Sequence, residues 1–131
     1  MTEAFDLPAA LTELLYGNEN DEPLEKTLDR LVTPGFVQRI NGRVYDRDQY
    51  IPHVREMRRM VTGGGELQVL EQSATATGFA GRYLFTMVQD GGQAATFESH
   101  LFARIEDGKI DRMIEVARQA EDGDGDLFAS A

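Results

Sequence analysis

The chain has 131 residues, a length that suits a single domain with a buried core. Hydrophobic residues make up 41% and charged residues 27%, a composition typical of globular proteins rather than of disordered or membrane proteins. The formal net charge of −10 argues against nucleic acid or an anionic membrane surface as a partner. Cysteine is absent, which excludes disulfides, thiolate nucleophiles and zinc sites built on cysteine.

The negative charge is concentrated at the two ends of the sequence. Residues 1–30 hold 8 acids and 2 bases, residues 31–118 hold 11 of each, and residues 119–131 hold 4 acids and no base. We therefore predict a single domain over residues 1–118, followed by an acidic flexible tail over 119–131. The tail segment Asp122-Gly123-Asp124-Gly125-Asp126 imitates the start of a calcium loop but lacks the glycine and glutamate that complete one. No metal site is predicted.

The sequence carries no evident targeting signal. Residues 1–6 are acidic and lack the charged-then-apolar layout of a signal peptide. No apolar run approaches the roughly 20 residues that span a bilayer. The sequence therefore predicts a cytoplasmic protein with no membrane partner.

Two short helices are predicted in the first third of the chain. Apolar residues from Leu7 to Leu15 recur at intervals of three and four, as on one face of a helix. Turn-forming residues at 17–21 interrupt that pattern, and Pro23 suits the first turn of a second helix. We expect the second helix to end at Thr33-Pro34-Gly35.

A hairpin and a third helix follow. Strands at 36–40 and 43–45 flank Asn41-Gly42, a strong signal for a two-residue hairpin turn because both positions readily adopt positive φ. Asp46 and Gln49 resemble the capping box that begins a helix. A run of three glycines is expected to end that helix.

The second half of the chain is rich in β-forming residues. Four long runs, at 67–77, 79–89, 94–105 and 110–118, are separated by short segments that contain glycine. Such short separators imply antiparallel hairpins. The sequence therefore predicts an α+β fold in which three amphipathic helices cover one face of a curved antiparallel sheet.

This order of elements resembles the cone-shaped α+β fold of nuclear transport factor 2, ketosteroid isomerase and the SnoaL-like polyketide cyclases, also called cystatin-like. The resemblance spans about residues 5–118 and is strongest over 108–115, where a Gly-Lys-Ile turn is followed by an acidic residue on the last strand. Residues 99–104 before the turn are also similar to the family. The resemblance implies a deep apolar pocket between helices and sheet, and a homodimer formed through the outer face of the sheet.

His100 and Glu115 are the candidate catalytic residues. His100 lies in the middle of a predicted strand, and pairing about the turn at Asp107-Gly108 places it roughly opposite Glu115. A carboxylate beside an imidazole fixes its tautomer, and both groups could move protons near neutral pH. The alternatives are that His100 only hydrogen-bonds within a pocket or dimer face, and that Glu115 is solvated or forms an interfacial ion pair.

Arg58, Tyr50, His53 and Phe102 are the candidate ligand-binding residues. Arg58 and Tyr50 lie on the apolar stripe of the third helix, and His53 lies near its edge. Phe102 follows His100 by two positions on its strand. An inward-pointing Arg58 could bind a substrate carboxylate. The alternative is an arginine stem packed on apolar surface with its head in water.

The family resemblance implies an enzyme that needs no cofactor: a SnoaL-like cyclase, isomerase or dehydratase acting on a small apolar or amphipathic carbonyl compound. His100 and Glu115 would transfer protons, and Arg58 would orient the ligand. The alternative is a non-catalytic ligand-binding or dimeric accessory protein on the same fold. Ketosteroid isomerase activity is not expected, because Val37-Gln38-Arg39-Ile40 lacks the carboxylate that those enzymes place near their first hairpin.

Overall fold

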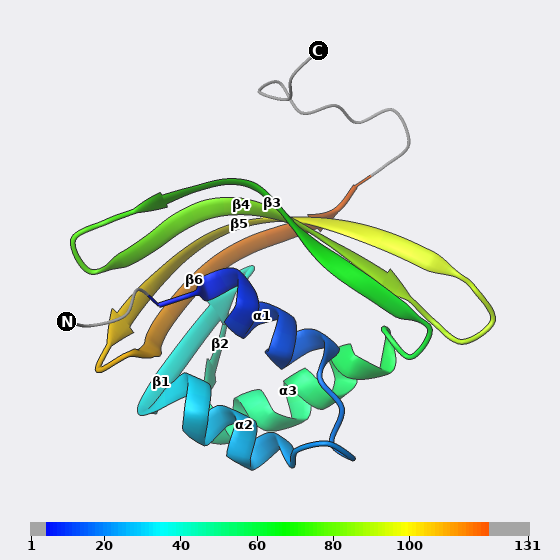
Figure 1. Ribbon diagram of the computed structural model, residues 1–131. Helices are drawn as coiled ribbons and strands as arrows, with labels where there is room; N and C mark the ends of the chain where they lie inside the picture. The colour runs from blue at the N-terminus through cyan, green and yellow to red at the C-terminus, as the bar shows by residue number, and fades with distance from the viewer. Residues whose placement is uncertain (1–4, 121–131) are drawn as a thin grey trace.

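A computed structural model describes residues 5–120, which form three helices and one curved six-stranded sheet (Figure 1). The α+β architecture predicted from the sequence is confirmed. The helices are α1 (Leu7–Tyr16), α2 (Leu24–Leu31) and α3 (Arg47–Arg59). The strands are β1 (Val32–Ile40), β2 (Arg43–Asp46), β3 (Gly64–Ala74), β4 (Gly78–Val88), β5 (Ala94–Glu106) and β6 (Lys109–Gln119). The predicted acidic tail, with its calcium-like segment, falls almost entirely outside the described residues.

Two of the helix and turn signals in the first half form the structures that the sequence predicts, and two expected helix ends differ. Asp46 and Gln49 form a complete capping box at the start of α3. Asn41 and Gly42 both have positive φ, 50° and 85°, in the turn between β1 and β2. Helix α2 ends at Leu31 rather than at residues 33–35, and α3 ends at Arg59, while Gly64 and Gly65 lie within β3. Pro34 lies within β1 between Val32 and Val37, where no residue pairs with β2 or β6, so it breaks no ladder bond.

The sheet has the strand order β2-β1-β6-β5-β4-β3. Strands β3 to β6 form the predicted antiparallel meander, with each strand paired to the next. Strand β1 runs parallel to β6, so the sheet is mixed at this one junction. The junction places the first hairpin beside the last strand, although some 70 residues separate them in the sequence.

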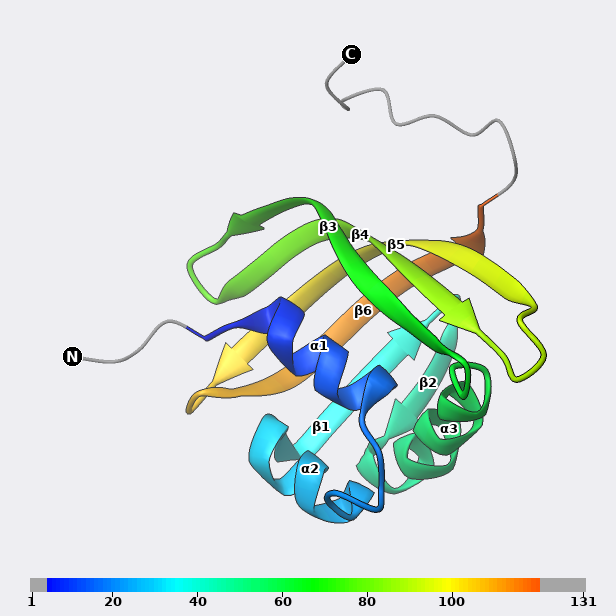
Figure 2. The same ribbon diagram turned by 45° about the vertical axis from the view of Figure 1, so that its right-hand side comes forward.

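Three irregularities interrupt the ladders of the curved sheet. They lie between Val32 and Val37 in the β1–β6 ladder, between Val69 and Glu71 in the β3–β4 ladder, and between Arg104 and Ile105 in the β5–β6 ladder. Bulges of this kind increase local twist and bend the strand that carries the extra residue. Figure 2 shows the result, a sheet that arches over α1 with α2 and α3 below it.

The core fills the space between the concave face of the sheet and the helices. Apolar side chains of α1 and α2 pack there against Tyr83, Leu101 and Met113 of the sheet. Within residues 5–120, no helix has both the length and the apolar character needed to cross a membrane.

Candidate functional site

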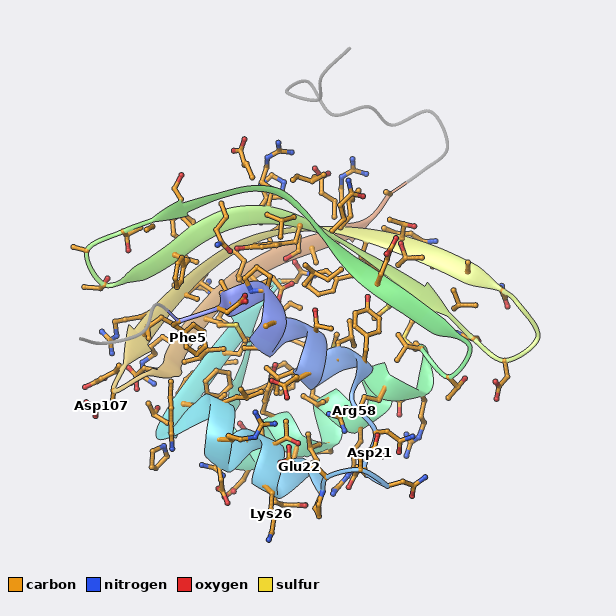
Figure 3. All side chains as sticks on the ribbon, viewed as in Figure 1. Phe5, Asp21, Glu22, Lys26, Arg58 and Asp107 are labelled. Carbon is orange, nitrogen blue, oxygen red and sulfur yellow. The ribbon has the colours of Figure 1, made fainter. Side chains whose placement is uncertain are left out.

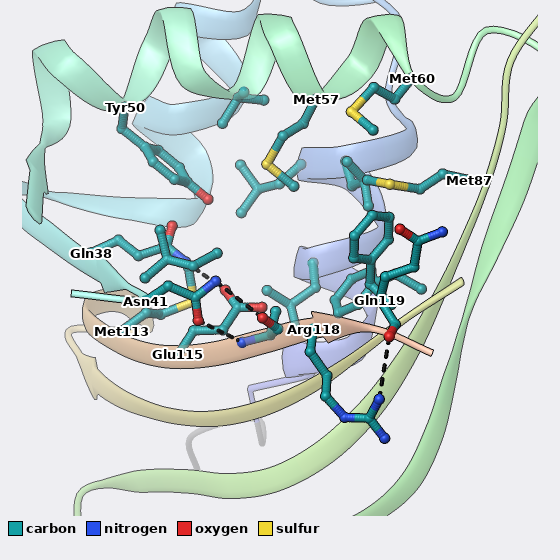
Figure 4. Close-up of a pocket in the computed structure, with 18 residues that line it drawn as sticks. Gln38, Asn41, Tyr50, Met57, Met60, Met87, Met113, Glu115, Arg118 and Gln119 are labelled. Carbon is teal, nitrogen blue, oxygen red and sulfur yellow. Dashed lines mark hydrogen bonds between the residues drawn. The ribbon is translucent and has the colours of Figure 1, made fainter. Parts of the chain in front are cut away.

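A cavity of about 360 Å³ lies between the concave face of the sheet and helices α1 and α3. Leucines of α1, methionines of α3 and aromatic residues of β4 and β5 form most of its wall. Its polar groups include Gln38 on β1, Tyr50 on α3 and Glu115 on β6. Figure 4 shows these three side chains at one end of the cavity and Met60 and Met87 towards the other.

Glu115 presents its carboxyl group to the cavity and is held by two neutral donors. Gln38 Nε2 donates to Oε1 over 2.7 Å, and Ser99 Oγ donates to Oε2 over 2.5 Å. Burial raises the pKa of Glu115, and the two hydrogen bonds oppose that effect without cancelling it. The carboxylate is therefore a stronger base than one in water, as proton-transfer catalysis requires.

Tyr50 places a hydroxyl group close to this carboxylate. The residue is only 5% exposed, and its ring packs against Phe36 with 4.9 Å between centroids. Burial, and secondarily the charge of Glu115, raise the pKa of Tyr50 far above neutral pH. Tyr50 is thus a neutral hydrogen-bond donor at every physiological pH, and its hydroxyl bonds to no other residue in the part of the chain described.

His100 does not face Glu115, so the predicted pairing is wrong. His100 lies opposite Val116, while Glu115 lies opposite Leu101. Because side chains alternate along a strand, this offset of one residue leaves His100 on the outer face of the sheet while Glu115 faces the cavity. Its side chain is 57% exposed there, with Nε2 3.7 Å from Glu98.

The cause of the shift is a bulge at Asp111. Ile105 pairs with Ile110, but Arg104 pairs with Arg112, so Asp111 has no partner on β5. Its carboxylate accepts hydrogen bonds from Thr33 Oγ1, at 2.9 Å, and from the Arg104 guanidinium. An unbroken ladder from the same turn would have placed His100 opposite Glu115.

Arg58 stabilises the end of helix α1 rather than lining the cavity (Figure 3). Its guanidinium donates to the carbonyl oxygens of Leu14, over 2.8 Å, and Glu13, over 3.0 Å. The Leu14 carbonyl belongs to the last turn of α1, where a helix leaves carbonyls without helical partners, and the Glu13 carbonyl also accepts from Gly17 N. Burial lowers the pKa of Arg58, but an arginine remains charged.

His53 and Phe102 also lie outside the cavity wall. The His53 ring stacks on Tyr45 with 4.4 Å between centroids. Phe102 is 63% exposed on the outer face of the sheet. Of the six candidate residues, the structure brings Glu115 and Tyr50 together in the cavity and places His100, Arg58, His53 and Phe102 elsewhere.

The fold is similar to solved structures over most of its length, although no protein-family model matches the sequence and no curated protein matches it. An NTF2-like protein of unknown function from Exiguobacterium superimposes with a TM-score of 0.66 and 19% identity, over 84% of this chain and 96% of that one. A SnoaL-like polyketide cyclase from Agrobacterium tumefaciens superimposes with a TM-score of 0.61 and 21% identity, over 84% of this chain and 86% of that one. The chain has the nuclear transport factor 2-like fold. AusH from Aspergillus nidulans superimposes with a TM-score of 0.67 and 11% identity, over 86% of this chain and 81% of that one.

Sequence reasoning missed two residues at the polar end of this NTF2-like cone. Ser99 and Gln38 are buried and hold the carboxyl group of Glu115. Gln38 was predictable from strand parity, because Phe36 and Gln38 alternate on β1 and Phe36 belongs to the core. Ser99 was predictable from the same kind of parity, because it alternates with the buried Leu101 and Ala103 on β5, which carries no extra residue.

The cavity wall is also rich in methionine. Met57, Met60, Met87 and Met113 all contribute to it, and the whole chain has five methionines. Methionine side chains are flexible and polarisable, so they adapt to apolar ligands of different outlines. Among residues 5–120, no cluster of three or more histidine, aspartate or glutamate side chains could hold a metal ion.

Proposed function

We propose that the protein binds a small apolar carbonyl compound in the cavity and that Glu115 transfers a proton to or from it. The reaction would be an isomerisation, cyclisation or dehydration that needs no cofactor. The observation that carries this proposal is a single carboxyl group of raised pKa, held by Gln38 and Ser99 at the end of an apolar cavity.

The proposed step is removal of a proton from the carbon next to the ligand carbonyl. The Glu115 carboxylate takes the proton, the C–H electron pair forms the C=C bond of an enolate, and the carbonyl oxygen gains the negative charge. The neutral Tyr50 hydroxyl donates a hydrogen bond to that oxygen. In a ligand whose enolate is conjugated with a further C=C bond, return of the proton from Glu115 to the far carbon of that system completes an isomerisation.

The comparisons support this class of ligand without identifying it. One of the similar structures is a SnoaL-like polyketide cyclase, and this chain shares its fold. His100 and Arg58 have no part in the proposed step, because neither lines the cavity. The second candidate function is ligand binding without turnover, which the adaptable methionine wall would serve equally well.

Exchange of carbon-bound hydrogen in D₂O tests the proposal without knowledge of the natural substrate. The probe is 2-tetralone, a bicyclic ketone whose α-protons are readily followed by NMR. We expect the protein to accelerate exchange, and Glu115→Gln to lower the protein-catalysed rate at least about 100-fold. His100→Gln is the matched control and should exchange at the wild-type rate. Binding of 2-tetralone with no accelerated exchange would favour the non-catalytic function.

We also propose that a second copy of the chain covers the outer face of the sheet. A row of side chains crosses five neighbouring strands there through the pairs Val44–Arg39, Arg39–Ile114, Ile114–Phe102 and Phe102–Ala80. Its three large apolar members are 54–63% exposed, which is unusual for a contiguous patch. The row contains no acidic residue that would oppose burial against the same row of another copy, and its one charged residue, Arg39, lies near its β2 end.

A further inference from the structure

The carbonyl oxygen of Gln38 is a buried acceptor that lacks a donor. Gln38 is 3% exposed, and its Oε1 has no hydrogen-bond partner among the described residues. Its Nε2 donates to Glu115 Oε1. This sets the orientation of the carboxamide, because a carboxylate attracts an N–H group and repels a carbonyl oxygen. Gln38 Oε1 is therefore directed away from Glu115, and the residue forms part of the cavity wall (Figure 4).

The Tyr50 hydroxyl supplies the complementary group. It is a donor that bonds to no other residue within 5–120, and its ring is held rigidly by contact with Phe36. Tyr50 and Gln38 come from α3 and β1, which pack together on one side of the cavity. One donor and one acceptor thus stand unpaired beside the same carboxylate.

We propose that Gln38 and Tyr50 form a subsite for a hydroxyl or enol group of the ligand. A ligand O–H donates to Gln38 Oε1, and the oxygen of the same group accepts from the Tyr50 hydroxyl. This inference deepens the proposed function, since it concerns the same cavity and narrows the ligand class to hydroxylated or enolised apolar compounds.

Other polar groups satisfy only half of the subsite. A ketone or ether oxygen accepts from Tyr50 but gives Gln38 Oε1 no donor, so we expect it to bind more weakly than a hydroxyl group in the same position. A hydroxyl group satisfies both residues. Much of the remaining wall is apolar and contains four adaptable methionines, so it fits the ring system that carries the hydroxyl.

Equilibrium binding of two matched probes tests the subsite without any turnover. The probes are 2-naphthol, which both donates and accepts, and 2-methoxynaphthalene, which only accepts. The measured quantity is the ratio of their dissociation constants in each variant by titration calorimetry. We expect wild-type protein to prefer 2-naphthol by about tenfold, and Gln38→Met to reduce that preference to near unity. The methoxy group of 2-methoxynaphthalene also adds bulk that 2-naphthol lacks. That difference is the same in every variant, so it cancels when the ratio of dissociation constants in one variant is compared with the ratio in another.

Two further variants make the assignment specific. Tyr50→Phe should weaken the binding of both probes by a similar factor, because both accept from the hydroxyl. It should therefore change the ratio of their dissociation constants less than Gln38→Met does. Gln68→Met introduces the same side chain on the exposed strand β3 and should keep the wild-type ratio. Thermal unfolding of each variant confirms that it is folded.

The proposal is overturned if Gln38→Met retains the preference for 2-naphthol, or if wild-type protein shows none. If the preference for 2-naphthol survives Gln38→Met and is lost in Glu115→Gln, the group that accepts the ligand O–H is the Glu115 carboxylate instead. Neither result bears on whether Glu115 accelerates hydrogen exchange, so failure of the subsite and failure of the proposed function are told apart.

Discussion

Ser99 and Glu115 are joined across strands β5 and β6 by a hydrogen bond of 2.5 Å inside the concave face of the sheet. Ser99 is completely buried, so its hydroxyl has no access to solvent as an alternative partner. The bond stabilises the ionised carboxylate and lowers the pKa of Glu115, against the larger effect of burial.

Ser99→Ala should raise the pKa of Glu115 further, because it removes a donor that favours the carboxylate. The base form of Glu115 would then require a higher pH. We therefore expect the acidic limb of the pH–rate profile for 2-tetralone exchange to move to higher pH. Thr96→Ala, on the same strand, should leave the profile in place. An unchanged profile in Ser99→Ala would contradict the role given to this hydrogen bond.

Glu115→Gln should stabilise the protein near neutral pH while abolishing exchange. Glu115 has a raised pKa in the folded state, so its contribution to stability is fully present below the ordinary pKa of 4.5 and is lost as pH rises through the folded value. Glutamine avoids that loss and can keep hydrogen bonds to both Gln38 and Ser99. In urea unfolding, the free energy of unfolding of Glu115→Gln should exceed that of the wild type by on the order of 1 kcal/mol at pH 7 and should equal it at pH 4. Equal gains at both values would show that the carboxylate is not destabilised by burial.

Arg58→Leu should destabilise the fold and leave ligand binding intact. The substitution removes two hydrogen bonds to the last carbonyls of α1, a loss of about 1–2 kcal/mol in the free energy of unfolding. The dissociation constant of 2-naphthol should match that of the wild type, because Arg58 lies outside the cavity wall. A large loss of affinity with little loss of stability would restore Arg58 to the ligand-binding role that the sequence suggested.

Phe102→Glu should dissociate the proposed homodimer. Burying a new carboxylate between two copies is unfavourable, so sedimentation at micromolar concentration should show a dimer for wild type and a monomer for the variant. Val69→Glu is the matched control, since Val69 is 41% exposed but pairs with Tyr83, whose side chain points into the core. A monomeric wild-type protein would rule the dimer out, and a monomeric Val69→Glu would show that the outer-face row is not the cause.

Local sequence signals account for most of the secondary structure, because the interactions that produce it are themselves local. Asn41-Gly42 forms its predicted turn with two positive φ angles, and Asp46 caps α3 within three residues of itself. The glycine-containing turns of the second half likewise join strands that are adjacent in the chain. These elements, taken in order, were enough to predict the α+β fold.

Which residues share the cavity was decided by contacts between distant segments. Asp111 bulges out of β6 because Thr33, 78 positions away, and Arg104 bind its carboxylate. That single extra residue turns Glu115 inward among Ser99, Gln38 and Tyr50, on the face of the sheet opposite His100. The sequence by itself determined the elements and their order, whereas the side-chain parity beyond the bulge, and with it the candidate site, came from tertiary structure. The physical reason is that strand parity has a period of two, so one residue displaced by a long-range contact reverses every side chain that follows.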